Sequence, residues 1–84
     1  MTVTRYIIRI HRQGVVGYVS ELENAEVGTI SWVASAFDER VLRFDTEAAA
    51  AAEIPALAST ADYIAGVLHR LPPAIDVVEI EVEQ

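Results

Sequence analysis

The stretch that decides the fold is "TRYIIRIHRQGVVGYVSEL", residues 4–22, because it holds two runs of strand-forming residues around a short polar turn. In the first run, Tyr6, Ile8 and Ile10 fall on one face of a strand, and the residues between them fall on the other: Arg5, Ile7, Arg9 and His11. The turn "RQGV" contains Gly14, which can adopt the positive φ that tight hairpins need. We therefore predict a strand over about residues 3–12 and a second strand that pairs back on it.

Further strands are predicted after the hairpin and at the end of the chain. "TISWV" (29–33) is rich in β-forming residues, and "VLRF" (41–44) is predicted as an additional short strand. Between them, "ASAFDER" (34–40) is predicted to form one helical turn. The final strand is "IDVVEIEV" (75–82), in which acidic and apolar residues alternate.

The first of two predicted helices is "TEAAAAAE" (46–53), which has the highest helix propensity in the chain. Asp45 is its expected N-cap, and Glu47 lies in the first turn, where the helix dipole favours an acid. Pro55 is expected to stop or kink this helix near Glu53, because proline lacks the amide hydrogen.

The second helix is predicted from the capping-box spacing of Ser59 and Asp62, and runs through "TADYIAGVLHRL" (60–71). The element order is then β-β-β-(β)-α-α-β. Because strands come first and helices late, we expect an α+β fold with a mostly antiparallel sheet of four to five strands and two helices on one face. The length predicts a single domain over residues 1–84.

The charge of the chain is acidic and unevenly distributed. The 84 residues have a net charge of −7; residues 1–20 hold three arginines and no acid, whereas the rest hold three arginines and thirteen acids. Such a chain should repel nucleic acid and anionic membranes and attract a basic protein. The sequence contains no run of about 18 apolar residues, which is the length needed to span a membrane. Because cysteine is absent and Arg5 and Arg9 interrupt the N-terminal apolar stretch, we expect a cytoplasmic protein.

Residues typical of catalytic and metal sites are absent or unfavourably spaced. His11 and His69 are the only histidines and have no HxxxH or HxH spacing, which argues against a metal site. No serine lies in a GxSxG elbow, and no phosphate-binding glycine motif is present. We predict a non-enzymatic protein without catalytic residues, cofactor or metal. An enzyme that uses clustered carboxylates with a divalent metal is an alternative.

The acids available to a partner are predicted in the loop after the hairpin and in the stretch "FDER". Five residues make up this predicted site: Glu21, Glu23, Glu26, Asp38 and Glu39. As a negative patch they would bind an Arg/Lys-rich groove. The alternative is that they only keep the protein soluble. Tyr18 and Trp32 flank the region as interface anchors or, as we expect for Trp32, as core residues.

The last strand carries a row of alternate carboxylates, Glu79, Glu81 and Glu83. Alternate strand residues lie roughly 6.6 Å apart, about two phosphate steps of ~3.4 Å along one DNA strand. In one interpretation the row therefore mimics nucleic acid. In the interpretation that we favour, the last strand pairs with the first, and the acids lie across from Arg5 and Arg9, where they set the register.

The alanine run 48–52 leaves two alternatives for the first helix. Alanine buries little surface but permits close approach, so we expect this helix to pack tightly on its own sheet. The alternative is a contact with the same helix of a second copy, which would make the protein a homodimer.

The stretch "GYVSELENAEVGTISWVASAFDERVLRFDTEAAA", residues 17–50, resembles a pattern in short phage and prophage proteins. They have a hairpin, a Trp-bearing strand and a step like Arg43, Phe44 and Asp45 into a helix. Small size, acidity and the lack of cysteine and of enzyme motifs are also similar to anti-CRISPR inhibitors. The resemblance implies a phage-encoded inhibitor that binds a nucleic-acid-binding host defence complex and blocks DNA access. The alternative is a structural or oligomerising small protein.

Overall fold

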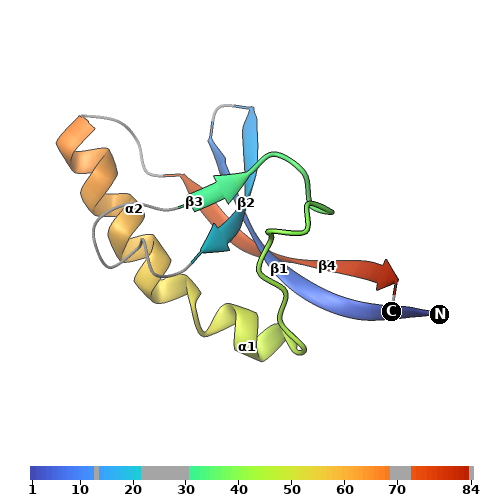
Figure 1. Cartoon of the computed structure of the whole chain (residues 1–84). Helices are drawn as coiled ribbons and strands as arrows, with labels where there is room; N and C mark the ends of the chain where they lie inside the picture. Colours follow the sequence, from blue (N-terminus) through green and yellow to red (C-terminus); the bar gives the residue numbers. More distant parts are fainter. Residues whose placement is uncertain (13, 22–30, 69–72, 84) are drawn as a thin grey trace.

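An antiparallel sheet of four strands carries the fold, in the spatial order β3-β2-β1-β4 (Figure 1). The computed structural model describes residues 1–12, 14–21, 31–68 and 73–83. The elements, in chain order, are β1 Thr2–Arg12, β2 Val15–Glu21, β3 Ser31–Val33, α1 Glu47–Ala51, α2 Ile54–Leu68 and β4 Ala74–Glu83. The α+β class and the antiparallel sheet are therefore confirmed.

The predicted hairpin is the centre of the sheet. Arg12 pairs with Val15 across the turn, and Gly14 has a φ of 83°, which agrees with the turn predicted from the sequence. On its other side β1 pairs with β4 along its whole length, from Thr2 with Glu83 to His11 with Ala74. The outer parts of β1 and β4 extend past the rest of the sheet as a two-stranded ribbon, with both termini at its end (Figure 1).

The segment predicted as a further strand, residues 41–44, makes one β-bridge. Phe44 exchanges two backbone hydrogen bonds with Tyr6, and the amide of Leu42 donates to the carbonyl of Val19 at 3.1 Å. The chain then turns into the cap of α1, so the ladder stops. A fifth strand is not confirmed in the described part of the chain. Residues 34–40, predicted as a helical turn, form two successive turns closed by backbone bonds from Asp38 to Ser35 and from Val41 to Asp38.

The helical region is one helix bent into two pieces, α1 and α2, instead of two separate helices. The bend falls at residues 52–53, as the position of Pro55 predicted. The capping-box prediction is wrong, because Ser59 lies inside α2. Proline is tolerated in the first turn of a helix, where its missing N–H has no intrahelical partner, so α2 begins directly at the bend.

The cap of α1 also differs from the prediction. Thr46, not Asp45, is the N-cap: its backbone is extended, and its Oγ1 accepts a hydrogen bond from the amide of Ala49 at 3.1 Å. The Asp45 carboxylate instead lies 3.4 Å from Nε of Arg5. The predicted place of Glu47 in the first turn is confirmed.

Apolar side chains cover both faces of the sheet. On one face, Ala50 of α1 and Leu57 of α2 are fully buried against Ile8 and Val19. Leu57, Ala61 and Ala65 follow a four-residue spacing, and this buried stripe of mostly small side chains lets α2 lie close to the sheet. Of the alanine run, Ala50 alone is buried, which places α1 on its own sheet as expected.

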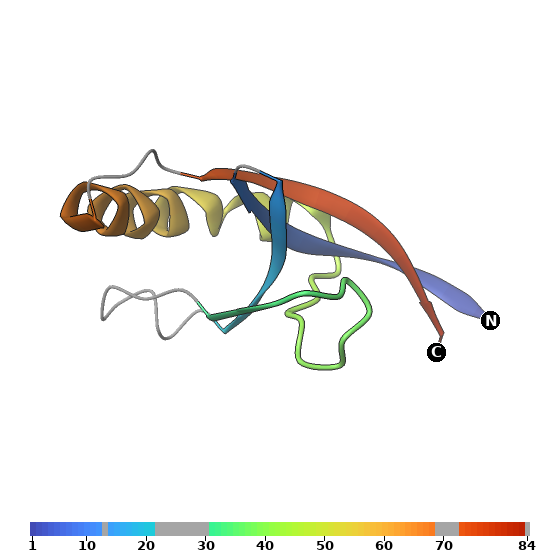
Figure 2. The ribbon, with the colours of Figure 1, turned by 90° about the horizontal axis from the view of Figure 1, so that it is seen from above.

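On the other face, the segment between β3 and α1 covers a second cluster. Ile7, Val41 and Ile80 are its buried members, and Val33, Ala36 and Val78 pack around them. Figure 2 shows this green segment and the helices on opposite sides of β1. Neighbouring residues of β1, Ile7 and Ile8, thus serve two separate clusters.

Candidate protein-interaction surface

Three of the five acids predicted as a partner-binding patch lie within the described residues. Glu21 is the last residue of β2, where its backbone pairs with Ser31. Glu23 and Glu26 lie outside the described residues. Asp38 and Glu39 lie in the covering segment between β3 and α1. The partner-binding patch of these five acids therefore stays a prediction.

The side chain of Asp38 stabilises the turn in which it lies. Its Oδ1 accepts from the backbone amide of Arg40 at 2.9 Å, and its two carboxylate oxygens accept from Nε and Nη2 of the same arginine, each at 3.0 Å. The hydrogen bonds from the Arg40 side chain, followed by that from its backbone amide, lower the pKa of Asp38 to about 2. The charge of Asp38 is thus matched by Arg40, whereas its neighbour Glu39 is exposed.

The carboxylates of β4 lie on the face opposite to the one predicted. In the register, Glu79 pairs with Tyr6, Glu81 with Thr4 and Glu83 with Thr2. Directly opposite residues of an antiparallel pair share a face, so these acids lie on the side of Tyr6 and Ile8. The prediction that they lie across from Arg5 and Arg9 is therefore wrong. We call Glu79, Glu81 and Glu83 the carboxylate row.

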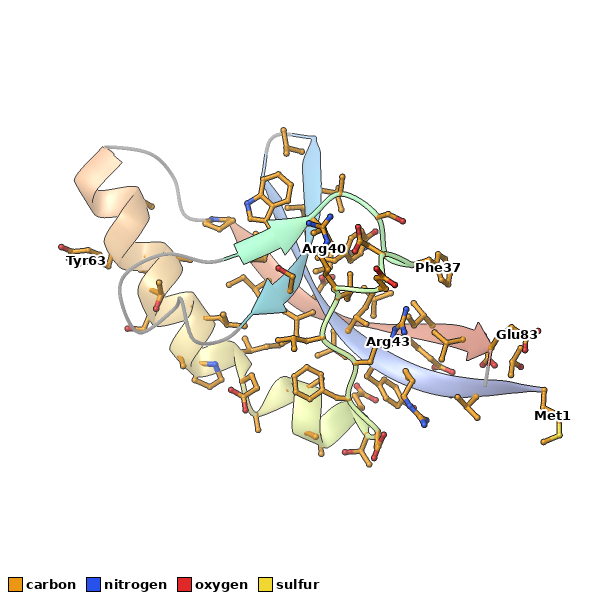
Figure 3. The ribbon with its side chains drawn as sticks, viewed as in Figure 1. Met1, Phe37, Arg40, Arg43, Tyr63 and Glu83 are labelled. Carbon is orange, nitrogen blue, oxygen red and sulfur yellow. The ribbon has the colours of Figure 1, made fainter. Side chains whose placement is uncertain are left out.

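The carboxylate row is exposed and forms no ion pair with an arginine that the structure describes. Oγ1 of Thr4 donates to Oε1 of Glu81 at 2.9 Å, and the N-terminal ammonium lies 3.6 Å from Glu83. Glu79 forms no ion pair with any residue that the structure describes. Figure 3 shows Glu83 at the end of the β1–β4 ribbon, beyond the helices. Among the described residues, at least two of the three carboxylates therefore have no cationic partner.

Two of the three arginines of β1, Arg5 and Arg9, are matched by aspartates on the other face. Arg9 lies across from Asp76, and its Nε donates to Oδ1 at 3.0 Å while Nη2 donates to Oδ2. This pairing raises the pKa of Arg9 above its ordinary value. Arg5 pairs with Asp45. The charges of the ribbon are therefore sorted by face, with arginine–aspartate pairs on one side and the carboxylate row on the other.

The prediction that Trp32 is a core residue is wrong. Its side chain is 50% exposed, and its ring lies on Gly17 of the neighbouring strand. Tyr18 packs against the cluster of Ile7 and Val41. Phe37 is 65% and Tyr63 67% exposed; Figure 3 shows them at the covering segment and on α2, well apart from each other. These aromatics do not gather into a single apolar patch.

Sequence reasoning noticed the carboxylate row but assigned its face wrongly. Both faces of β1 carry a buried isoleucine. The apolar pattern therefore does not decide which face of β4 shares a side of the sheet with Arg5 and Arg9. The one available signal was Asp76, which shares its alternation with Val78 and Ile80 and is the natural partner of Arg9.

The described side chains form no group of three His, Asp or Glu residues that could hold a metal ion. Among the same residues, no helix is long and apolar enough to cross a membrane. The strongest chemical feature on the described surface is the row of uncompensated carboxylates on an edge strand. Comparison of the chain with protein-family models, with curated proteins and with solved structures gave no match.

Proposed function

We propose that this protein is a non-enzymatic, acidic protein-binding module that occupies the nucleic-acid-binding surface of a basic partner. The observation that carries the proposal is the carboxylate row. Its three acids are exposed on one face of a regular strand and form no ion pair with an arginine in the described part of the chain. Their spacing of roughly 6.6 Å is close to two phosphate steps along one DNA strand.

Binding of this kind needs charge complementarity and no chemistry. A row of fixed negative charges accelerates encounter with a basic groove and is repelled by acidic surfaces. Because the acids lie on paired β-strands, their spacing is maintained without a partner, and little order has to be gained on binding. The partner class that we favour is a nucleic-acid-binding host defence complex, with the protein acting as a phage-encoded, anti-CRISPR-like inhibitor. The resemblance of residues 17–50 to phage proteins supports the source, and the small size, the acidity and the lack of cysteine and enzyme motifs support the inhibitor class.

The test uses two triple variants that remove the same charge from different places. The first carries Glu79→Gln, Glu81→Gln and Glu83→Gln. The second carries Glu21→Gln, Glu23→Gln and Glu26→Gln, the loop acids of the predicted patch. Tagged protein and both variants are used to co-purify partners from the native cell over a series of salt concentrations, and the recovered complex is assayed for binding of DNA or RNA.

We expect the first variant to lose the partner and the second to keep it, because the carboxylate row supplies the contact. Retention should fall with salt, and bound protein should displace nucleic acid. The opposite pattern would move the site to the loop after β2. Salt-independent retention by both variants, with nucleic-acid binding of the partner untouched, contradicts the proposal.

The second candidate function is self-association. Self-association is favoured by a surface of small exposed residues on α1 and its C-cap, made up of Ala48, Ala49, Ala51 and Ala52. Light scattering over a dilution series separates the two functions. A dimer that is lost when exposed Ala49 is changed to glutamate supports self-association, and a strict monomer excludes it.

A further inference from the structure

The outer edge of β4 has backbone groups that no described element uses. β4 is the last strand of the sheet. Tyr6 directs both its amide and its carbonyl to Phe44, at 3.0 and 2.9 Å. In an antiparallel ladder a residue bonded on one side has no backbone group left for the other side, so Tyr6 and its alternate neighbours do not bond to β4. The residues between them, Arg5, Ile7 and Arg9, make that ladder.

The same alternation determines in which direction the backbone amides and carbonyls of β4 point. The partners of Arg5, Ile7 and Arg9 are Ile80, Val78 and Asp76, so these residues point their amides and carbonyls inward. The members of the carboxylate row, which lie between and beyond them, point theirs to the open edge. Each of these residues therefore offers a backbone donor, a backbone acceptor and an exposed carboxylate.

The two faces of β4 differ in chemistry, and this defines what an added strand would meet. One face carries the carboxylate row. The other carries Val78, Ile80 and Val82, of which Ile80 is buried and the two valines are half-buried. A strand laid along the edge would find acids and apolar side chains in strict alternation.

We propose that this edge binds an extended segment of the basic partner as a fifth strand, with Arg or Lys at alternate positions and apolar residues between them. The inference rests on the proposed function and adds the mode of binding. Backbone hydrogen bonds would supply affinity, and opposite charges across the two strands would set the register. A second copy of the chain is disfavoured as occupant, because antiparallel pairing of β4 with β4 collects the acids of both strands on one face.

The probe is a synthetic peptide of alternating arginine and valine, blocked at both ends, compared with a peptide of the same composition in which the arginines and valines form two blocks. Amide hydrogen exchange of the intact protein is followed by NMR. In the free protein we expect fast exchange at Glu79 and Glu81 and slow exchange at Val78 and Ile80. The alternating peptide should slow exchange at Glu79 and Glu81 by roughly tenfold or more, and the block peptide should not.

A chemically ligated protein with N-methylated amides at Glu79 and Glu81 keeps both carboxylates and blocks the edge. Its matched control is Glu79→Gln with Glu81→Gln, which keeps the edge and removes the charges. We expect N-methylation to weaken the alternating peptide by roughly tenfold, and the glutamine variant to abolish the salt dependence of binding.

Exchange at Glu79 and Glu81 that is unchanged by the peptide would overturn the inference, as would equal binding of both peptides. Either result would overturn the inference even if co-purification shows that the carboxylate row is needed. The proposed function would then rest on the carboxylate side chains alone, without backbone pairing at the edge. The exchange experiment on unmodified protein does not depend on whether the ligated protein folds.

Discussion

At the residue scale, the contact between Gly17 and Trp32 explains why a glycine occupies position 17 of β2. A Cβ atom on Gly17 would lie 2.2 Å from Cε3 of the indole ring, inside any real contact distance. Glycine in a strand is unfavourable for backbone entropy, and here it makes room for a large aromatic side chain that covers the strand. The residue is therefore tied to its cross-strand neighbour.

Replacing Gly17 by alanine should displace the indole ring and lower the free energy of unfolding by about 1–3 kcal/mol. The matched control is Gly66→Ala in α2, where an added Cβ meets nothing within 4 Å and should stabilise the helix by about 0.5–1 kcal/mol. Urea unfolding followed by far-UV circular dichroism measures both. The explanation fails if Gly17→Ala is as stable as wild type, or if it stays destabilising when combined with Trp32→Val.

The turn at Asp38 should give the protein a specific sensitivity to acid. Hydrogen bonds from Arg40 hold the pKa of Asp38 at about 2, below its usual value of ~3.9 in an unfolded chain. A lowered pKa in the folded state means that the charged carboxylate stabilises the fold above about pH 4, and that this contribution is lost as the pH falls to about 2.

We therefore expect the urea midpoint to fall between about pH 4 and pH 2, and part of that fall to be absent in Asp38→Asn. The neighbouring substitution Glu39→Gln is the control, since Glu39 is exposed and forms no ion pair with a described residue. Identical pH profiles for Asp38→Asn and wild type would show that the Arg40 contact does not contribute.

At the scale of the elements, the start of α1 illustrates competition between two neighbouring cap residues. Asp45 and Thr46 are both good N-caps by residue type. Arg5 lies within 3.4 Å of the Asp45 carboxylate, and Phe44 is held by its bridge to Tyr6. Phe44 is bonded to β1, and the Asp45 side chain points to Arg5. Thr46, the next residue, therefore caps the helix.

Thr46→Ala should lower the free energy of unfolding by about 1 kcal/mol, because the amide of Ala49 loses its hydrogen-bond acceptor. Asp45→Ala should cost less, since its side chain is 87% exposed in the Arg5 pair. Thermal unfolding by circular dichroism compares the two. A larger loss for Asp45→Ala would return the cap to the residue predicted from the sequence.

At the scale of the whole molecule, one sheet serves two apolar clusters on its opposite faces. Ile7 and Ile8 are adjacent in β1, are 0% and 1% exposed, and belong to different clusters. The helices close one cluster, and the segment around Val41 closes the other. Because β1 is shared, the two clusters cannot come apart independently.

We expect Leu57→Ala on the helix side and Ile7→Ala on the other side each to cost about 2–5 kcal/mol. In both variants, far-UV circular dichroism and Trp32 fluorescence should report the same urea midpoint, as in a two-state transition. Phe37→Ala is the control and should change stability by less than about 0.5 kcal/mol, because the side chain is 65% exposed. Separate midpoints for the two probes would show two independent units.

The features that depend on neighbours along the chain follow from the amino-acid sequence alone. Strand alternation, the positive φ of Gly14, the bend before Pro55 and the order of elements all follow from backbone and side-chain preferences over a few residues. The α+β class follows from that order. The acidic character of the molecule and the spacing within the carboxylate row are sequence properties too.

Only the tertiary structure decided which face of the sheet each charge joins. A shift of one residue in pairing moves every side chain of β4 to the opposite face, and with buried isoleucines on both faces of β1 the apolar pattern allowed either choice. The observed register pairs Asp76 with Arg9 and places the carboxylate row across from Tyr6, Thr4 and Thr2 instead of the arginines. Long-range pairing of the two ends of the chain, which local preferences do not contain, therefore created the surface that we propose as the binding site.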